Sequence, residues 1–447
     1  MSSVSADVKN LAAVPDATSR YVLWVLMLTC ALNFLDRQVV NILAEPIKKE
    51  FGLSDTELGL LTGFAFAAFH ATLSIPVARL ADRTNRSYLI AGSMAVWSLA
   101  TVASGFVSSF GQLLAARMTV GLGEAGGIAP AHALIADYTP KVRRARAIAF
   151  YSIGIPLGGL FGMAIGGLVM DAYGWRTAFI VAGVPGLILA PLLAMTIRDP
   201  KRSRSQSAEP EAAMPAREAF REMASKKAFL LVTAAGALMM LVSFSHAAFM
   251  ASFFFRVHGP ELNNIASSIS GSLGTTFGAA ALLGLALGLS RGLTGIAGTL
   301  IGGHVTDRID GRGYRAYATI PAYVTLVRIP ILIAGLLVGD AILAFMLLAF
   351  QWLLSGAGSI GGFAAVQGLV RPQVRATAAA VYALGINLVG LGIGPLLVGL
   401  LSDILAAGGL GTAEGLRWAL ISCTGLLVVA ATFNWMARDL ITQESVS

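Results

Sequence analysis

The sequence predicts an all-α integral membrane protein whose twelve transmembrane helices form two pseudo-symmetric bundles of six. Three observations lead to this prediction: the composition, the spacing of the apolar segments and an internal repeat. Hydrophobic residues make up 56% of the 447 residues, charged residues make up 13%, and the mean hydropathy is +0.74. A soluble domain carries roughly 25% charged residues. The composition therefore indicates a polytopic membrane protein.

The apolar segments have the length of membrane-spanning helices, which need about 20 residues each. The segment from Met1 to Ser19 is polar and lacks the basic-then-apolar order of a cleavable signal, so we expect the first span to be retained. We expect spans near residues 21–43, 55–78, 87–108, 110–136, 146–170, 175–197, 228–255, 273–303, 316–338, 341–369, 376–402 and 416–437.

Lysine and arginine predict the orientation of these spans. One set of alternate loops holds twenty of these residues, and the opposite loops hold five. Positive charge gathers in cytoplasmic loops, so we expect both termini in the cytoplasm. The net charge of +8 follows mostly from this bias and from attraction to anionic membrane lipids, and it does not indicate a nucleic-acid partner.

One long polar segment divides the chain. Residues 198–227 are rich in serine, proline and charge, and we interpret them as a cytoplasmic linker between an N-terminal bundle, residues 1–197, and a C-terminal bundle, residues 228–447. The second half of this linker alternates Phe220 and Met223 with basic residues, which is typical of an interfacial amphipathic helix. A plain solvated linker is an equal alternative.

Two short motifs return in the second half of the chain. Pro140-Lys141-Val142-Arg143 returns as Pro372-Gln373-Val374-Arg375, and Asp82-Arg83 returns as Asp307-Arg308. The two offsets in the numbering are similar, so the halves of the chain look like copies of each other. Such six-span repeats are typical of secondary transporters that rock two bundles around a site at the membrane midplane. The repeat therefore favours a transporter.

Arg117 and Glu124 are the charged residues of a long apolar segment, from Ser87 to Ala136, that holds no other charge. A charge at the bilayer centre costs roughly 2.5–3.5 kcal/mol, so such residues usually face a protein interior and mark function. Because they are seven residues apart, they project from one helix face about 10 Å apart. Gly121 between them is expected to leave that face open.

Asp36 and Arg37 reach a similar depth in the first span, so we expect Asp36 to pair with Arg117. Desolvation favours the neutral form of a buried carboxyl and a nearby arginine favours the charged form, so alternating water access can move a proton on and off. We predict Asp36 as the main proton carrier and Glu124 as the second, with Arg117 switching partners. A purely structural ion-pair cluster is the alternative.

An anionic substrate needs a cationic site. Arg291 lies in the middle of the eighth span without a local counter-ion. We predict substrate binding by Arg37, Arg117, Arg291 and Glu124. The alternative for Arg291 is that it snorkels to the interface or pairs with another residue.

Two aspartates are predicted to gate the cytoplasmic side. The fifth and eleventh helices begin just after Pro140 and Pro372, so their positive N-terminal ends lie at this face. Asp82 is placed to cap the eleventh helix and Asp307 the fifth, while anchoring of their own loops is the alternative. The predicted gating set, including the neighbouring arginines, is Asp82, Arg83, Arg86, Asp307 and Arg308.

Several motifs resemble the major facilitator superfamily. They are Ala78-Arg79-Leu80-Ala81-Asp82-Arg83-Thr84-Asn85-Arg86, the stretch from Arg117 to Ala125, and Gly174-Trp175-Arg176-Thr177-Ala178-Phe179. The resemblance implies that glycine ladders in spans 2, 5 and 8 bring the two halves together, although packing within each bundle is the alternative. The ladders are Gly154, Gly158, Gly162 and Gly166; Gly284, Gly288 and Gly292; and Gly59 and Gly63 with Ala67 and Ala71.

Closer matches resemble the bacterial members of the spinster-like lipid transporters. They are Asn33-Phe34-Leu35-Asp36-Arg37, Asp82-Arg83-Thr84-Asn85-Arg86, Gly121-Leu122-Gly123-Glu124-Ala125 and Ile155-Pro156-Leu157-Gly158. This resemblance implies a bacterial inner membrane protein that exports lysophospholipid or sphingoid-phosphate amphiphiles.

The predicted function is proton-coupled secondary transport of an amphipathic anionic lipid by alternating access. Transport of small organic anions such as sugar acids is the alternative within this class, and a membrane receptor or scaffold is the alternative outside it. The spans show no nucleophile-and-base grouping, no metal-ligand spacing and no phosphate-binding loop, so we expect no enzyme activity, no metal and no cofactor. We expect the protein to be a monomer.

Overall fold

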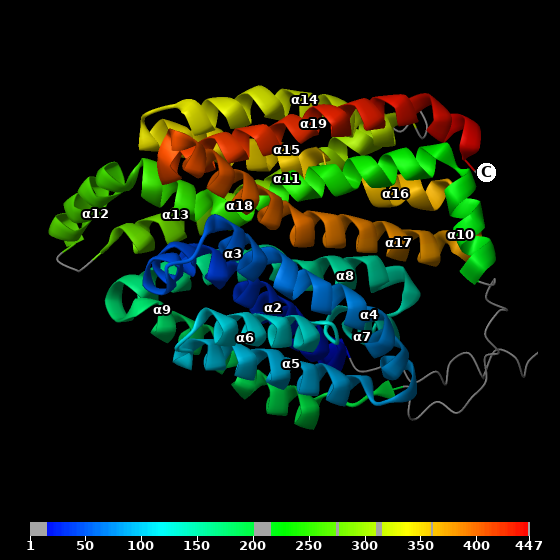
Figure 1. Cartoon of the computed structure of the whole chain (residues 1–447). Coiled ribbons are helices and arrows are strands. Elements are labelled where there is room, and N and C mark those ends of the chain that lie inside the picture. Colours follow the sequence, from blue (N-terminus) through cyan, green and yellow to red (C-terminus); the bar gives the residue numbers. More distant parts are fainter. Residues whose placement is uncertain (1–15, 201–215, 274–276, 310–314, 359–360, 446–447) are drawn as a thin grey trace, which may run out of the picture.

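The computed structural model describes residues 16–200, 216–273, 277–309, 315–358 and 361–445, and these residues are helical with no β-strand (Figure 1). Eight helical segments in this part of the chain are long and apolar enough to cross a membrane. Two of them, Arg144–Thr196 and Thr377–Glu444, are 53 and 68 residues long. Glycines with positive φ kink both, Gly174 in the first and Gly409 in the second, so each holds two consecutive helices.

The first half of the chain holds helices that begin and end close to the predicted spans. They are α2 (Asp16–Phe51), α3 (Asp55–Gly59), η1 (Leu60–Phe64), α4 (Ala65–Arg83), α5 (Arg86–Ala103), η2 (Ser104–Phe106), α6 (Phe110–Glu124), α7 (Ile128–Tyr138), η3 (Lys141–Arg143), α8 (Arg144–Ser152) and α9 (Gly154–Thr196). α3, η1 and α4 follow one another with αR backbone angles at each junction, so residues 55–83 form one continuous helix.

The second half begins with the short helix α10 (Ala216–Ser225), which lies within the predicted linker; residues 201–215 of that linker lie outside the described residues. The remaining helices are α11 (Lys227–Val257), α12 (Gly259–Leu273), α13 (Ala279–Ile309), α14 (Ala316–Leu337), α15 (Ala341–Gly358), α16 (Gly361–Gly368), η6 (Pro372–Val374), α17 (Arg375–Asn387), η7 (Leu388–Ile393), α18 (Gly394–Leu405), η8 (Ala406–Leu410) and α19 (Gly411–Glu444).

Side-chain caps fix several helix starts. The Ser54 hydroxyl accepts from the Glu57 amide while the Glu57 carboxylate accepts from the Ser54 amide, which is a capping box. Asn85 caps α5 and Ser109 caps α6 in the same manner, with a side-chain oxygen that accepts from the first turn. We call the end of the helices that holds Asp55 the Asp55 end, and the opposite end, which holds Arg86, the Arg86 end.

The helices pack mainly within each half of the chain. In the first half α2 packs along α9, and α5 packs against both α9 and α6; in the second half α19 packs against α11 and α14. Figure 1 shows the blue-to-teal helices of the first half below the green-to-red helices of the second. The halves meet where α9 contacts α13, where α2 contacts α11 and where α3, η1 and α4 contact η7 and α18.

The buried apolar residues show that this contact is closest at the Asp55 end. One cluster there joins both halves and includes Ile47 and Phe179 of the first half with Phe253 and Val398 of the second. Toward the Arg86 end the core divides into one cluster from the first half and another from the second. The halves therefore share a core at one end and keep separate cores at the other.

Glycines along α9 and α13 show that the distance between these helices also increases toward the Arg86 end. A methyl group added at Gly167, Gly284 or Gly288 would lie within 3.0 Å of a backbone carbonyl oxygen of the other helix, which is closer than real Cβ contacts. At Gly292, nearer the Arg86 end, the same distance is 3.6 Å, and at Gly295 no atom lies within 4 Å. The two helices thus separate gradually toward the Arg86 end.

Candidate functional site

A small cavity lies where α2, η1, α4 and α6 of the first half face α11, η7 and α18 of the second. Its volume is about 30 Å³, and its walls include Arg37, Gln38, Asn41 and Arg117 on one side and Phe244 on the other. A water molecule needs roughly 10–15 Å³ of such space. In this conformation the cavity is therefore large enough for one or two waters and too small for an organic substrate.

Arg37 and Glu124 form a buried ion pair beside this cavity. The Nε of Arg37 donates to Oε2 of Glu124 at 2.6 Å, and the Glu124 side chain is fully buried. The Arg37 guanidinium also lies 4.6 Å from the ring centroid of Phe66 and 5.1 Å from that of Phe34. Cation–π contacts of this kind hold a guanidinium in place while leaving its N–H groups available to other acceptors.

Asp36 and Arg117 are both almost fully buried, with 1% of each residue exposed, but the structure shows no ion pair between them. Oδ1 of Asp36 and both Nε and Nη1 of Arg117 lack a hydrogen-bond partner. Each residue nevertheless interacts electrostatically with the other and with Glu124. The structure thus differs from the expected Asp36–Arg117 pair, and the ion pair of this cluster joins Arg37 to Glu124 instead.

Other polar atoms around this cluster are also unsatisfied. Both amide atoms of Asn33, the Thr101 hydroxyl and Oε1 of Glu124 are buried without a hydrogen-bond partner. Buried polar groups are nearly always hydrogen-bonded, so these atoms mark the cluster as a place where polar groups lack strong protein partners.

Arg291 reaches the same region from the second half of the chain. Its Nη1 donates to Oε1 of Gln38 at 3.1 Å, and the Nδ2 of Asn41 donates to the same oxygen at 3.1 Å. Arg291 therefore has an amide partner rather than a carboxylate. The sequence analysis missed Gln38 and Asn41, although their positions shortly after Asp36 and Arg37 place them on the same stretch of α2.

The structure corrects the expectation for Gly121. The carbonyl oxygen of Phe66 lies 2.5 Å from the position of a Cβ added at Gly121, so the helix face between Arg117 and Glu124 is not open. α4 fills it. The glycine instead allows α4 to pack closely on α6 beside the charged cluster.

Among the predicted gating residues, the structure describes the side chains of Arg83 and Arg86. Arg86 binds within the first half of the chain: its Nη2 lies 2.5 Å from Asp137 and 2.6 Å from Asp199, and its backbone amide donates to Asp199. Arg83 is exposed. The side chains of Asp82, Asp307 and Arg308 lie outside the described residues.

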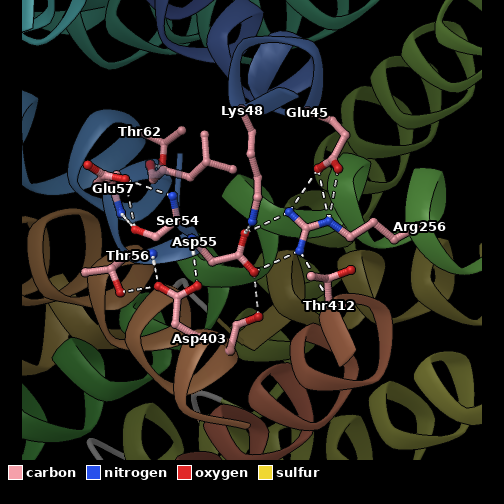
Figure 2. A network of polar contacts seen from close by, with 12 residues as sticks. Glu45, Lys48, Ser54, Asp55, Thr56, Glu57, Thr62, Arg256, Asp403 and Thr412 are labelled. Atoms are coloured by element: carbon pink, nitrogen blue, oxygen red, sulfur yellow. Dashed lines mark hydrogen bonds and ion pairs between the residues drawn. The ribbon is translucent and has the colours of Figure 1, made fainter. Parts of the chain in front are cut away.

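A polar network that the sequence analysis did not single out joins the two halves at the Asp55 end (Figure 2). Arg256 of α11 binds Asp55 through two parallel hydrogen bonds of 2.8 Å and binds Glu45 of α2 at 3.0–3.1 Å. Lys48 and the Ser402 hydroxyl also bind Asp55. In the sequence, Lys48 and Arg256 are two of the five basic residues that we counted in the opposite loops. No local pattern distinguishes them, because their partners lie elsewhere in the chain.

Among the residues that the structure describes, no group of three or more histidine, cysteine, aspartate or glutamate side chains is arranged to hold a metal ion. The site itself contains two carboxylates, three arginines and the amides around them. Such a set can bind an anion, exchange ion-pair partners and carry a proton.

Comparison with known proteins identifies the family. The sequence model of the Major Facilitator Superfamily matches residues 26–291, more than half of the chain. The chain belongs to the major facilitator superfamily. This membership confirms the predicted multi-pass membrane transporter and the prediction that the chain is not an enzyme.

Individual relatives agree with the resemblance to spinster proteins. An "MFS-type efflux pump" of Mycolicibacterium smegmatis is 33% identical over 94% of both chains, and "Protein spinster homolog 1" of Homo sapiens is 29% identical over 89% of this chain and 75% of its own. The solved structure of a bacterial homolog to the human lysosomal transporter spinster, inward-facing and unoccupied, has a TM-score of 0.84 and 29% identity, covering 97% of this chain and 99% of that one.

A more distant relative bears on the substrate. The "Probable galactarate/D-glucarate transporter GudP" of Bacillus subtilis is 26% identical over 43% of this chain and 45% of its own. Both spinster and sugar-acid transporters are thus among the proteins similar to this chain.

Proposed function

We propose that this member of the superfamily is a proton-coupled secondary transporter of an amphipathic anionic lipid, of the lysophospholipid or sphingoid-phosphate type. The observation that carries the proposal is the buried cluster in which Glu124 pairs with Arg37 while Asp36 and Arg117 remain without hydrogen-bond partners at several atoms. A cluster of two carboxylates and two arginines at membrane depth has more than one way to pair its charges, which is what a coupling site requires.

We assign twelve spans in two bundles, residues 1–197 and 228–447, joined by a cytoplasmic linker at 198–227. Both termini then lie in the cytoplasm, so the Arg86 end is cytoplasmic and the Asp55 end is external. The kinks at Gly174 and Gly409 support the count, since each divides a long apolar segment into two helices. The loosening of α9 from α13 toward the Arg86 end supports an inward-facing conformation, the state of the bacterial spinster homolog compared above.

The proton would be carried by Asp36, with Glu124 as the second site. When the cluster faces external water, a proton binds the Asp36 carboxylate and leaves Arg117 to pair with Glu124. Arg37 is then released from Glu124 and is available to an anionic substrate. In the inward-facing state the Asp36 carboxyl gives its proton to cytoplasmic water, and Arg37 returns to Glu124.

The head group of the substrate would be held by Arg37, Arg117 and Arg291, with Glu124 as the competing partner for the arginines. Arg291 comes from the second half of the chain and reaches α2 through Gln38, so an anion bound there contacts both bundles. Phe244 and Leu391, which line the same cavity, offer apolar surface to a tail. Opening of the cavity toward the Arg86 end would provide the room that it lacks here.

Two alternatives remain in the proposal. Transport of a sugar acid is favoured by the amides of Gln38 and Asn41 at the cavity and by the partial similarity to the Bacillus subtilis relative. The alternative outside this class is a receptor or scaffold that moves no substrate.

Uptake into proteoliposomes separates these alternatives. Labelled lysophospholipid and labelled sugar acid are each offered with and without an imposed pH gradient, and liposomes without protein provide the background. We expect the gradient to stimulate lysophospholipid movement and to leave the sugar acid at background. If the gradient stimulates movement of the sugar acid alone, the protein is a sugar-acid transporter. If neither substrate moves above background, the lipid proposal is overturned.

A further inference from the structure

An aspartate of the second half caps a helix of the first half at the Asp55 end. The carboxylate of Asp403 in α18 accepts hydrogen bonds from the backbone amides of Asp55, at 2.9 Å, and Thr56, at 2.8 Å (Figure 2). These amides begin the continuous helix of residues 55–83, whose first N–H groups have no partner within the helix. The start of this helix is therefore completed by a side chain from the opposite half.

The contact between α9 and α13 contains a similar cap, with the roles of the two halves exchanged. The carboxylate of Asp171 in α9, in the first half, accepts from the backbone amide of Ala281 at 2.6 Å, and the amides of Ala280 and Gly278 also donate to it. These amides lie at the start of α13 in the second half. Each half thus supplies one aspartate to a helix start of the other.

The internal repeat relates the two caps to each other. In the numbering, Asp403 follows Asp171 by the same interval that separates Pro372 from Pro140. Likewise, Ala280 follows Asp55 by the interval that separates Asp307 from Asp82. The acceptor and the donor positions are thus both equivalent under the repeat, so the pair of caps follows the pseudo-symmetry of the molecule.

We propose that Asp171 and Asp403 are paired positioning residues that hold the external ends of the two bundles together while the site opens to the cytoplasm. The proposal rests on the proposed transport function and its orientation. Each carboxylate stabilises a helix N-terminus, which carries a partial positive charge. Rocking to the outward-facing state separates each carboxylate from its helix, so both caps break together and neither bundle can open alone at this end.

The two caps have unequal support. At Asp403 the ion pairs of Asp55 with Arg256 and Lys48 join the halves as well. No ion pair accompanies Asp171 in the described part of the chain. Removing the charge of Asp171 should therefore open the external end more than removing that of Asp403.

Accessibility of an engineered cysteine tests the proposal without reference to any substrate. Thr62 lines the cavity, and Thr62→Cys is introduced in a background with Cys30→Ser and Cys423→Ser. A membrane-impermeant maleimide is then added from outside. Asp403→Asn and Asp171→Asn should each raise the labelling rate about two- to five-fold, the range of one charge at a helix N-terminus, with the larger increase for Asp171→Asn.

Asp340 provides a matched control. It caps α15 from the same end, accepting from the Leu343 amide at 2.7 Å, but both residues lie in the second half. Asp340→Asn should leave labelling unchanged. Asp171→Asn keeps a carbonyl oxygen that can accept from the helix amides, whereas Asp171→Ala removes this oxygen together with the charge, so labelling should rise further in Asp171→Ala than in Asp171→Asn.

Labelling that stays at the wild-type rate in both asparagine variants, or that rises equally in Asp340→Asn, overturns the proposal. This outcome is separate from failure of the proposed function. A protein that moves no lipid can still show the accessibility change, and a protein with full proton-driven flux can lack it.

Discussion

The Nε of Arg37 lies 2.6 Å from Oε2 of Glu124, although the two residues are 87 positions apart and belong to different helices. The pair engages Glu124, the carboxylate that lies on the same helix as Arg117. It leaves Asp36 and Arg117 as neighbours with unused hydrogen-bonding atoms. The first two predictions concern the groups around this pair.

We predict that Asp36→Asn abolishes flux driven by a pH gradient. The amide fills the same space but cannot gain or lose a proton. The measurement is gradient-driven uptake into proteoliposomes, with the melting temperature and substrate binding as controls for the fold. Glu124→Gln should retain part of the flux, because Glu124 is the second site. Full flux in Asp36→Asn contradicts the assignment of the proton carrier.

We predict that Arg291→Ala weakens binding of a lysophospholipid about 10- to 100-fold, the effect of losing roughly 1.5–3 kcal/mol of hydrogen bonding to a charged group. Binding of an uncharged lipid with the same tail should change little. Titration of both ligands into the purified protein provides the comparison. Lys49→Ala, which removes an exposed cation, is the control. Equal losses for both lipids exclude a head-group role for Arg291.

We predict that Gly284→Ala shifts the protein away from this conformation. The added methyl group would crowd the carbonyl oxygen of Met163, and overpacking typically costs about 1–3 kcal/mol. Gly292→Ala is the matched control on the same helix, because its added methyl group would lie 3.6 Å from the carbonyl oxygen of Pro156, an ordinary van der Waals distance. It should be neutral or slightly stabilising, since alanine favours a helix by about 1 kcal/mol over glycine.

Thermal unfolding and maleimide labelling of Thr62→Cys together test this third prediction. Gly284→Ala should lower the melting temperature and raise labelling from the Asp55 end. If the melting temperature falls equally in both variants, the effect comes from the loss of a glycine and not from the contact with α9, which contradicts the prediction.

We predict that Arg256→Gln destabilises the protein strongly. It removes the guanidinium from Glu45 and Asp55, which are both buried, and removing one partner of a buried pair costs about 3–5 kcal/mol. Arg417→Gln at the same end is the control, because its partner Glu414 is exposed and such pairs contribute only about 0–1 kcal/mol. Comparable melting temperatures for the two variants contradict the role assigned to the network.

We predict that α10 detaches from the second half at acidic pH. Burial raises the pKa of the Glu222 carboxyl, but hydrogen bonds from the backbone and side chain of Arg371 outweigh it, so its pKa lies below its usual range. A lowered pKa in the docked state means that the contact is fully stabilising above the usual glutamate value, about 4.3, and is lost as pH falls through the lowered value.

Hydrogen exchange of residues 216–225 measures the docking of α10. Protection should be constant at neutral pH and should fall below pH 4, after correction for the intrinsic exchange rate. In Glu222→Gln the fall should disappear, because the remaining amide does not titrate in this range. A fall that persists in Glu222→Gln assigns the detachment to another group.

Local signals in the sequence predicted the helices and identified the charged residues that the structure buries. Long apolar runs identify spans, and a lone arginine or carboxylate within them is conspicuous, so Asp36, Arg37, Arg117, Glu124 and Arg291 could be chosen without coordinates. Their pairing could not be predicted. The pair of Arg37 with Glu124 depends on which side-chain atoms of neighbouring helices come within hydrogen-bonding distance, and helical periodicity fixes only the face and the depth.

The network at the Asp55 end shows a second limit. Arg256 lies 211 residues from Glu45 and 201 from Asp55, so only the folded chain brings them together. In the sequence each looks like an ordinary charge near the end of a span. The repeat offsets were visible in the sequence, but Asp171 and Asp403 carried no signal until their hydrogen bonds identified them as equivalent.

The core that both halves share at the Asp55 end also sets how temperature acts on the protein. If the two halves rock as proposed, opening that end would expose Phe253, Val398 and their neighbours to water, whereas the cores at the Arg86 end each belong to one half. Hydration of newly exposed apolar surface raises the heat capacity. The free-energy difference between the two proposed states would therefore curve with temperature, and cooling would weaken the apolar attraction that keeps the Asp55 end shut.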